Sequence, residues 1–412
     1  MELLDILIKK GVDIPNPHGV EIREDVKPES ISGKGVTIHS GSKIMGKSTL
    51  ILEGAQIGYE APVTINDCHI GPDVQLKGGY FEKAVFLEGA IAGSGAHVRS
   101  GTILEDGARI AHTVGLKQTI LFPFVTLGSL INFCDCFMAG GSDRNNHSEV
   151  GSSYIHFNYT PNQDKATASL IGDVPNGVML RQNPIFLGGQ GGLVGPCRIS
   201  YGTVIAAGSI YRKDILKQDR IVFQGGGRGG SMPNLPGIYK SVKRQALNNI
   251  IYLANLIALL HWYRHVRILF ISRRFPETLF NGLIKNLEDA IETRIKAFKV
   301  FCDKLQYSSE TYRETYKNNV SALLLHQKSE LYEKQNAVED LFLKCMHDVV
   351  NKTAPDLFLA EVKDNIKQEE KQRYIKTIKS LDEKTGKIGT KWLQEIVDHI
   401  TGQVITILPS LK

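Results

Sequence analysis

The stretch FLEGAIAGSGAHVRSGTILEDGARIAHTVGLKQTILF, residues 86–122, repeats with a period of six residues. Every sixth position holds an apolar side chain, and the residue four places later is small or β-branched; the sixth positions are Phe86, Ala92, Val98, Leu104, Ile110, Leu116 and Phe122. Neither an α-helix, with 3.6 residues per turn, nor a strand, with a period of two, produces this pattern. It is typical of a parallel β-helix, in which each hexad forms one flat side and three hexads complete a triangular coil of about eighteen residues.

The same register occurs in two other parts of the chain. It returns at Leu187, Leu193, Ile199, Ile205 and Tyr211, and a shorter run precedes the first block at Ile51, Ile57 and Val63. We therefore predict a left-handed parallel β-helix over residues 21–223, left-handed because hexapeptide coils of this type usually are, in contrast to the right-handed rule for other parallel crossovers. The side chains expected inside it are Phe86, Val98, Leu104, Ile110, Leu116, Leu193, Ile199 and Ile205.

Glycine and proline divide the chain into two parts. Of the 40 glycines, 36 lie at or before Gly237, and only three prolines follow that residue. Apolar residues beyond it recur at intervals of three and four, which is typical of amphipathic helices. We expect a helix and turn over residues 1–20, the β-helix over 21–223 with an inserted polar loop at 129–186, a Gly/Pro linker at 224–237 and an α-helical domain over 238–412.

Charge and cysteine content argue against several classes of protein. The net charge of +6 lies mostly in the helical half, but basic and acidic residues are interspersed there, which favours an ordinary solvated surface over one that binds nucleic acid. The most apolar stretch, residues 250–260, is too short to span a bilayer. Six scattered cysteines and the lack of a signal peptide favour a cytoplasmic protein. Cys134 and Cys136 lack a second pair of ligands, and the His-x4-His spacing of a zinc hydratase built on such a prism is missing, so we expect no metal site.

The polar insert and the later coils carry a family resemblance. The segment His156-Phe-Asn-Tyr-Thr-Pro-Asn-Gln-Asp-Lys165, continuing to Ile-Gly-Asp173, resembles the Cys-Asn-Tyr-Asp-Gly…Lys…Ile-Gly-Asp segment of the bifunctional UDP-N-acetylglucosamine pyrophosphorylase / glucosamine-1-phosphate N-acetyltransferase family. Asn132-Phe133 is similar to the family's Gly-Asn-Phe motif, and residues 188–214 are similar to its coenzyme-side coils. The resemblance covers residues 30–215 and only the acetyltransferase half of the family; we expect no pyrophosphorylase domain.

This resemblance implies a set of site residues. Asn158, Tyr159 and Lys165 would bind the acceptor, and the cosubstrate would be acetyl-CoA or another acyl-CoA. The residues expected on the cosubstrate side are Gly189, Ala207 and Arg212.

The cations of the family pattern are incomplete in this chain. Phe137 stands where the family has a basic residue, and the family's arginine has no counterpart unless Lys117 replaces it. Lys165 lies one place beyond the family's lysine, where this chain has Asp164. These differences weaken the expectation of a phosphorylated acceptor, because cations of this kind pair with phosphate oxygens.

Acyl transfer needs a base that deprotonates the acceptor amine or hydroxyl. Histidine suits this role because its pKa lies near neutrality. His147, eleven residues before Asn158 in the polar insert, is our candidate, and His112 and His156 are the alternatives.

Together these features predict an acyl-CoA-dependent acyltransferase that transfers an acetyl group to a small sugar-phosphate or amino-sugar-like acceptor. It would belong to UDP-N-acetylglucosamine and nucleotide-sugar metabolism and would act as a homotrimer, with each site between neighbouring prisms. The alternative is a non-catalytic trimeric β-helix scaffold whose basic helical domain binds a partner. The missing cations and the size of the helical half favour that alternative.

Overall fold

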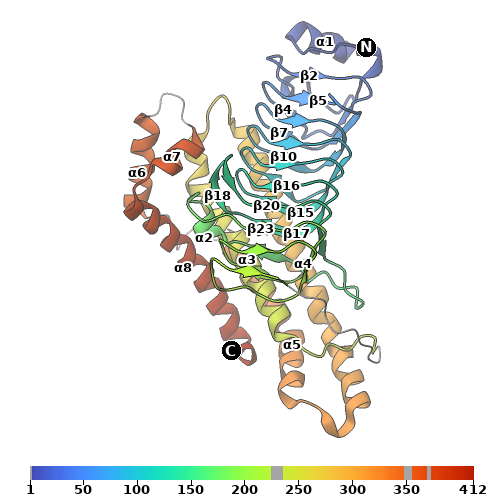
Figure 1. Ribbon diagram of the computed structural model, residues 1–412, viewed down its shortest axis with the longest axis vertical. Helices are drawn as coiled ribbons and strands as arrows, with labels where there is room; N and C mark the ends of the chain where they lie inside the picture. The colour runs from blue at the N-terminus through green and yellow to red at the C-terminus, as the bar shows by residue number, and fades with distance from the viewer. Residues whose placement is uncertain (1, 224–234, 348–354, 369–372) are drawn as a thin grey trace.

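The computed structural model describes residues 2–223, 235–347, 355–368 and 373–412. Its N-terminal half is a parallel β-helix, and its C-terminal half is a group of α-helices that lies along the side of the prism and extends beyond its last coil (Figure 1). This confirms the predicted β-helix followed by a helical region. Most of the predicted linker at 224–237 lies outside the described residues.

The coils stack their strands into three flat faces. The first face is the ten-stranded sheet of β2 (Thr37–Ile38), β5 (Gln56–Ile57), β8 (Gln75–Leu76), β11 (Ile91–Ala92), β14 (Arg109–Ile110), β16 (Thr126–Leu127), β20 (Glu149–Val150), β23 (Phe186–Leu187), β26 (Val204–Ile205) and β28 (Ile221–Val222). The second face contains β1 (Glu21–Ile22), β3 (Lys43–Met45), β6 (Val63–Asn66), β9 (Gly79–Glu82), β12 (Ala96–Val98), the first parts of β15 (Gly115–Leu121) and β17 (Asn132–Met138), β21 (Ile155–Phe157), β24 (Gly192–Val194) and β27 (Ile210–Tyr211). The third face contains β4 (Leu50–Ile51), β7 (His69–Ile70), β10 (Ala84–Phe86), β13 (Thr102–Leu104), the last parts of β15 and β17, β22 (Ser169–Ile171) and β25 (Arg198–Ile199).

The chain visits the faces in this order, so each coil turns at three edges, which we name edge 1–2, edge 2–3 and edge 3–1 after the faces that they join. At edge 2–3 one residue in the left-handed region can be enough for the turn, as with Gln118 (φ 50°) inside β15 and Asp135 (φ 61°) inside β17. These two strands therefore continue from the second face onto the third.

In the described part of the chain, one α-helix precedes the prism in the sequence, a short one lies within it, and the others follow it. Their bounds are α1 (Glu2–Lys10), α2 (Val174–Gly177), α3 (Lys243–His265), α4 (Glu277–Tyr316), α5 (Ala322–His347), α6 (Asp356–Gln368), α7 (Tyr374–Ser380) and α8 (Glu383–Ile407). Helix α4 packs along β7, β10 and β13, and α3 packs on β22, α4 and α8. No helix in the described ranges is long and apolar enough to cross a membrane.

The predicted interior of the prism is confirmed, with one shift of register. Each of the eight residues expected inside is at most 2% exposed. The register predicted for Phe122 is wrong, because β13 pairs with β15 as Leu104↔Leu121, one residue short of an eighteen-residue step. Leu121 therefore occupies the interior position, and the Phe122 ring packs against the ring of Phe137, with centroids 4.7 Å apart.

The polar segment 129–186 is not a single inserted loop, which corrects the expected organisation. It supplies strands β17, β20, β21 and β22, which continue the three faces. The real excursions are shorter: a hairpin of β18 (Gly141–Asp143) and β19 (Asn146–His147) at edge 3–1, the loop between β21 and β22 at edge 2–3, and the segment around α2 at edge 3–1. The hexad pattern fails here because these excursions interrupt the count between strands.

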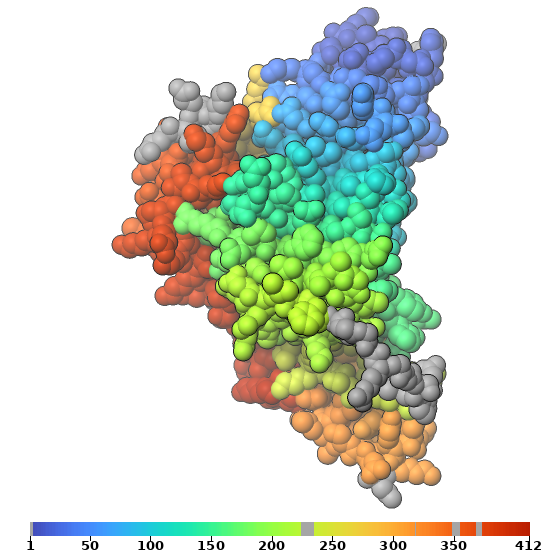
Figure 2. All heavy atoms as spheres, in the orientation of Figure 1, coloured from blue at the N-terminus to red at the C-terminus, as the bar shows by residue number. Residues whose placement is uncertain are grey.

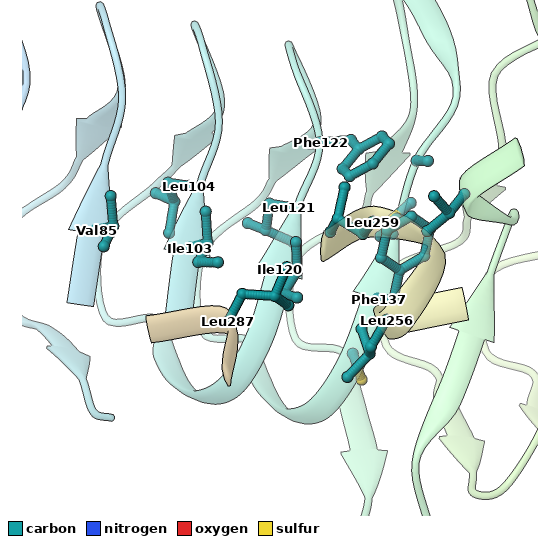
Figure 3. Close-up of a cluster of buried hydrophobic side chains, with 14 of the residues drawn as sticks. Val85, Ile103, Leu104, Ile120, Leu121, Phe122, Phe137, Leu256, Leu259 and Leu287 are labelled. Carbon is teal, nitrogen blue, oxygen red and sulfur yellow. The ribbon is translucent and has the colours of Figure 1, made fainter. Parts of the chain in front are cut away.

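The outward side of the third face is apolar and is covered by the helical half. Its outward side chains are Val85, Ile103, Ile120, Phe137 and Leu170, each at most 5% exposed. Leu256 and Leu259 of α3 and Leu287 of α4 lie against this column (Figure 3). Coils in the middle and lower part of the prism stay uncovered on the side facing the viewer in Figure 2, with the red C-terminal helices beside them.

Candidate active site

The site residues expected from the sequence lie on three different edges of the prism. The placements are Gly189 and Ala207 at edge 1–2, Asn158, Tyr159, Lys165 and Arg212 at edge 2–3, and His147 at edge 3–1.

The loop between β21 and β22 brings three of these residues together. Asn158 donates a hydrogen bond from Nδ2 to Oδ2 of Asp135 at 3.1 Å. The Lys165 ammonium group lies 5.7 Å from the centre of the Tyr159 ring, and Tyr159 is 65% exposed. An amide, a phenol and an ammonium group therefore lie together at edge 2–3, where they can bind hydroxyl and phosphate oxygens.

Asp135, on which this loop rests, was missed by the sequence reasoning. The residue is 2% exposed, and its Oδ1 lies 3.0 Å from Nη1 of Arg294 on α4. Its sequence signal is a lone acidic residue in the apolar run Phe133-Cys-Asp-Cys-Phe-Met138. A buried carboxylate needs a charged or hydrogen-bonding partner, so this position should have prompted a search for one.

Two cations on the second face lie next to the loop. Arg99 and Lys117 occupy equivalent positions on successive coils, because β12 pairs with β15 as Val98↔Leu116. Lys117 pairs in register with Cys134, which immediately precedes Asp135, and Nη2 of Arg99 lies 3.9 Å from the Cys134 sulfur. Within the described part of the chain no carboxylate pairs with either cation, and Nε of Arg99 is buried without a partner. Arg99 was missed, although its spacing of one coil from Lys117 could have revealed it.

His147 lies on the hairpin at edge 3–1. Its Nε2 is 4.0 Å from Oε2 of Glu149, and its Nδ1 is buried without a hydrogen-bond partner. Burial lowers the pKa of His147 below its usual value, and the Arg144 guanidinium acts in the same direction. The imidazole is therefore neutral near pH 7 and can accept a proton.

The two alternative histidines differ from each other. His156 points into the prism and is 2% exposed; its Nδ1 lies 2.6 Å from the Cys134 carbonyl and its Nε2 lies 2.8 Å from Oγ of Ser169. Burial lowers the pKa of His156 to about 4, so this residue is a neutral core side chain with both nitrogens bonded. His112 is exposed at edge 1–2, with its Nδ1 2.9 Å from Oγ of Ser129.

Gly189 and Ala207 meet on neighbouring coils at edge 1–2. The amide of Gly208 donates to the carbonyl of Gly189 at 2.9 Å. A Cβ at Gly188 would lie 2.3 Å from the Ala207 nitrogen, so only glycine lets these two turns stack. Ala207 and Gly208 are exposed, and a Cβ at Gly208 would meet nothing within 4 Å, which leaves a short open strip at this turn of the edge. Arg212 does not join it, because it lies across the second face at edge 2–3.

Within one chain, His147 and Asn158 do not meet. Asn158 contacts Asp135, where β17 enters the third face, whereas His147 pairs with Gly141, beyond the end of that strand. The width of the third face separates the two residues. An active site that uses both therefore requires a second copy of the chain.

Comparisons with known proteins agree with the resemblance seen in the sequence. The chain is 28% identical over 216 residues to a protein named Bifunctional protein GlmU from Thermotoga sp. (strain RQ2), which is 52% of this chain and 43% of that protein. It is 30% identical over 210 residues to the protein of that name from Pelobacter propionicus, covering 51% of this chain and 40% of the relative. The chain thus spans less than half the length of these relatives, and no family model matches it. Taken with the β-helix, these similarities identify the prism as resembling the acetyltransferase half of the bifunctional GlmU family.

Proposed function

We propose that this protein transfers an acetyl or other acyl group from coenzyme A to a small sugar-phosphate or amino-sugar-like acceptor. The observation that carries the proposal is the group of Asn158, Tyr159 and Lys165 at edge 2–3, beside the unpaired cations Arg99 and Lys117. Guanidinium and ammonium groups without carboxylate partners bind phosphate oxygens well. They supply the positive charge that the family pattern in the sequence lacks.

The chemistry would need only one base. His147, neutral near pH 7, takes a proton from the acceptor amine or hydroxyl as that group attacks the thioester carbonyl. A new bond forms from the acceptor nitrogen or oxygen to the acyl carbon, the carbon–sulfur bond breaks, and the proton passes from His147 to the departing thiolate. A base of this kind contributes about 10²–10⁴-fold, and positioning of the two substrates contributes the rest.

The open strip at edge 1–2 supports a coenzyme A site. Ala207 and Gly208 are exposed, and a Cβ at Gly208 would meet nothing within 4 Å, so the surface of this turn is accessible. A slender pantetheine arm could lie along this turn and accept hydrogen bonds from backbone amides.

A homotrimer would complete the site. The helical half covers the third face, so only the first and second faces are free, and both carry exposed apolar side chains on the later coils: Ile155, Phe157 and Ile210 on the second face, and Phe186 and Ile221 on the first. A threefold axis beside edge 1–2 would turn the first face of each prism toward the second face of the next and leave a wedge between them, bounded by edge 3–1 of one copy and edge 2–3 of its neighbour. The proposed site would lie in that wedge, between His147 of one copy and Asn158 of the adjacent copy.

The test combines binding with turnover. Acetyl-CoA at saturating concentration should raise the melting temperature, and acetyl-CoA with glucosamine 1-phosphate should release free thiol. His147→Ala should slow release by about 10²–10⁴-fold and leave the acetyl-CoA shift unchanged. Thiol release at the wild-type rate by His147→Ala would exclude His147 as the base. A wild-type protein that shows no shift with any acyl-CoA would support the scaffold alternative instead.

A further inference from the structure

The loop that carries the proposed acceptor residues is anchored in the helical half. Arg294, on α4 and 5% exposed, faces the carboxylate of Asp135 at 3.0 Å, and Asp135 in turn accepts the hydrogen bond from Asn158. The Arg294 guanidinium also donates to the carbonyl of Lys165 at 3.3 Å. One buried side chain of α4 thus contacts the loop directly at Lys165 and supports Asn158 through Asp135.

A second anchor lies next to Lys165 in the same loop. The carboxylate of Asp164 is fully buried, and its Oδ2 accepts hydrogen bonds from the hydroxyls of Thr160 at 2.8 Å and Tyr239 at 2.7 Å. Its Oδ1 accepts from Nε2 of Gln245 at 3.1 Å. Tyr239 and Gln245 belong to the helical half, so the fold of the loop depends on contacts made across the two parts of the chain.

Helix α4 reaches Asp135 because it runs along edge 2–3. A Cβ at Gly282 would lie 2.3 Å from Cδ2 of His69, and Asn286 donates from Nδ2 to the carbonyl of Lys83 at 2.7 Å. Positions 282, 286 and 294 lie about 40° and then about a further 80° apart around the helix, so together they span about a third of its circumference, and each of them contacts the prism. The close approach at Gly282 brings the helix against the prism, and Arg294 meets Asp135 about three turns further along the same broad side.

We propose that Arg294 is a positioning residue for acceptor binding, which gives the helical half a role in the chemistry of the prism. Arg294 holds Asp135, Asp135 orients the amide of Asn158, and the bond to Lys165 fixes the far end of the loop. The inference rests on the proposed acyl transfer for its kinetic consequence, but the ordering of the loop follows from the contacts alone. Arg294 does not itself touch the acceptor.

The experiment compares Arg294→Gln with Arg294→Lys and with Lys285→Gln in the full chain. Lys285 is the matched control, because it lies on the same helix and its ammonium group pairs with Asp289 at the surface, at 2.7 Å. Hydrogen–deuterium exchange of residues 158–167 reports loop order, and the KM for glucosamine 1-phosphate and the Kd for acetyl-CoA report function. For Arg294→Gln we expect exchange in the loop to rise at least tenfold and KM to rise at least tenfold, with the Kd for acetyl-CoA unchanged. Arg294→Lys should recover part of both effects, and Lys285→Gln should match the wild type.

Two further measurements keep the test decisive. If Arg294→Gln does not fold, Tyr239→Phe is measured in its place. This variant removes the hydroxyl that donates to Asp164, and it should still raise hydrogen exchange in the loop. If Arg294→Gln folds, hydrogen exchange and a KM equal to those of the wild type would overturn the proposal. If it does not fold, wild-type hydrogen exchange in Tyr239→Phe would overturn it. A wild-type protein without transferase activity would refute the proposed function, while the exchange data would still decide whether Arg294 orders the loop.

Discussion

Glu105 should make the stability of this protein depend on pH. The residue follows β13 at edge 3–1, is 2% exposed, and accepts a hydrogen bond from the hydroxyl of Tyr263 on α3. Arg267 pairs with Asp106 at 2.7 Å, and Glu105 forms no ion pair with any residue that the structure describes. Burial is the largest cause that raises the pKa of Glu105 from 4.5 to about 7.

The direction of the effect follows from the shift. An acid whose pKa is higher in the folded than in the unfolded protein stabilises the fold while it is protonated. That contribution is complete below the unfolded value of 4.5, declines as the pH rises, and is lost above about 7. At about 1.4 kcal/mol for each pKa unit, the loss amounts to about 3 kcal/mol. Glu105→Gln retains an oxygen that accepts from Tyr263 but cannot ionise, so it should avoid this loss.

The measurement is the free energy of unfolding in urea for both proteins between about pH 5 and pH 8. Trp262, buried on α3 beside this cluster, provides a fluorescence signal from the relevant region. Glu105→Gln should gain stability relative to the wild type by about 3 kcal/mol across this range. A difference that stays constant from pH 5 to pH 8 would refute the reasoning. Glu24→Gln, at an exposed position, serves as the control.

Three other predictions follow from the packing. Ile110→Asp buries a carboxylate inside the prism at a cost of several kcal/mol, so it should yield little folded protein by circular dichroism; a wild-type melting temperature would contradict the assigned interior. Leu256→Asp should loosen α3 from the third face and raise hydrogen exchange in β17 and β22, and unchanged exchange would mean that α3 does not protect that face. Sedimentation should give three times the chain mass of 45.6 kDa, and Phe157→Glu with Ile210→Glu should reduce it to one chain; a wild-type monomer would remove the shared site.

The hexad pattern predicts the stacking of coils because it records which side chains must face inward. The pattern assigns the wrong residue to the interior where a coil is one residue shorter and its composition does not show it. Gln118 turns edge 2–3 as a single left-handed residue, and this shortens the coil by one position, so that Leu121 replaces Phe122 inside. A polar residue such as glutamine carries no sequence signal for that conformation, whereas glycine at Gly101, at the same edge, does.

The side of the prism that the helical half covers is indicated by the outward-pointing residues, which the hexad pattern does not describe. Val85, Ile103 and Ile120 are the outward neighbours of interior residues, and a face exposed to water would carry polar side chains there, as the first face does at Gln75 and Arg109. An apolar outward column predicts a cover, but this can be recognised only after the register of each strand is known.

The site shows a sharper limit of sequence reasoning. The lone carboxylate of Asp135 in an apolar run requires a charged or hydrogen-bonding partner, and that requirement follows from the sequence because an unpaired charge in a core costs too much. Which residue satisfies it does not follow, since Arg294 lies 159 positions away on a helix whose packing against the prism, close at Gly282 and His69, is not visible in the sequence. The contacts that orient Asn158 thus depend on how the β-helix and helix α4 pack against each other. For the same reason a prism without α4 would leave Asp135 without its cation beneath the loop between β21 and β22.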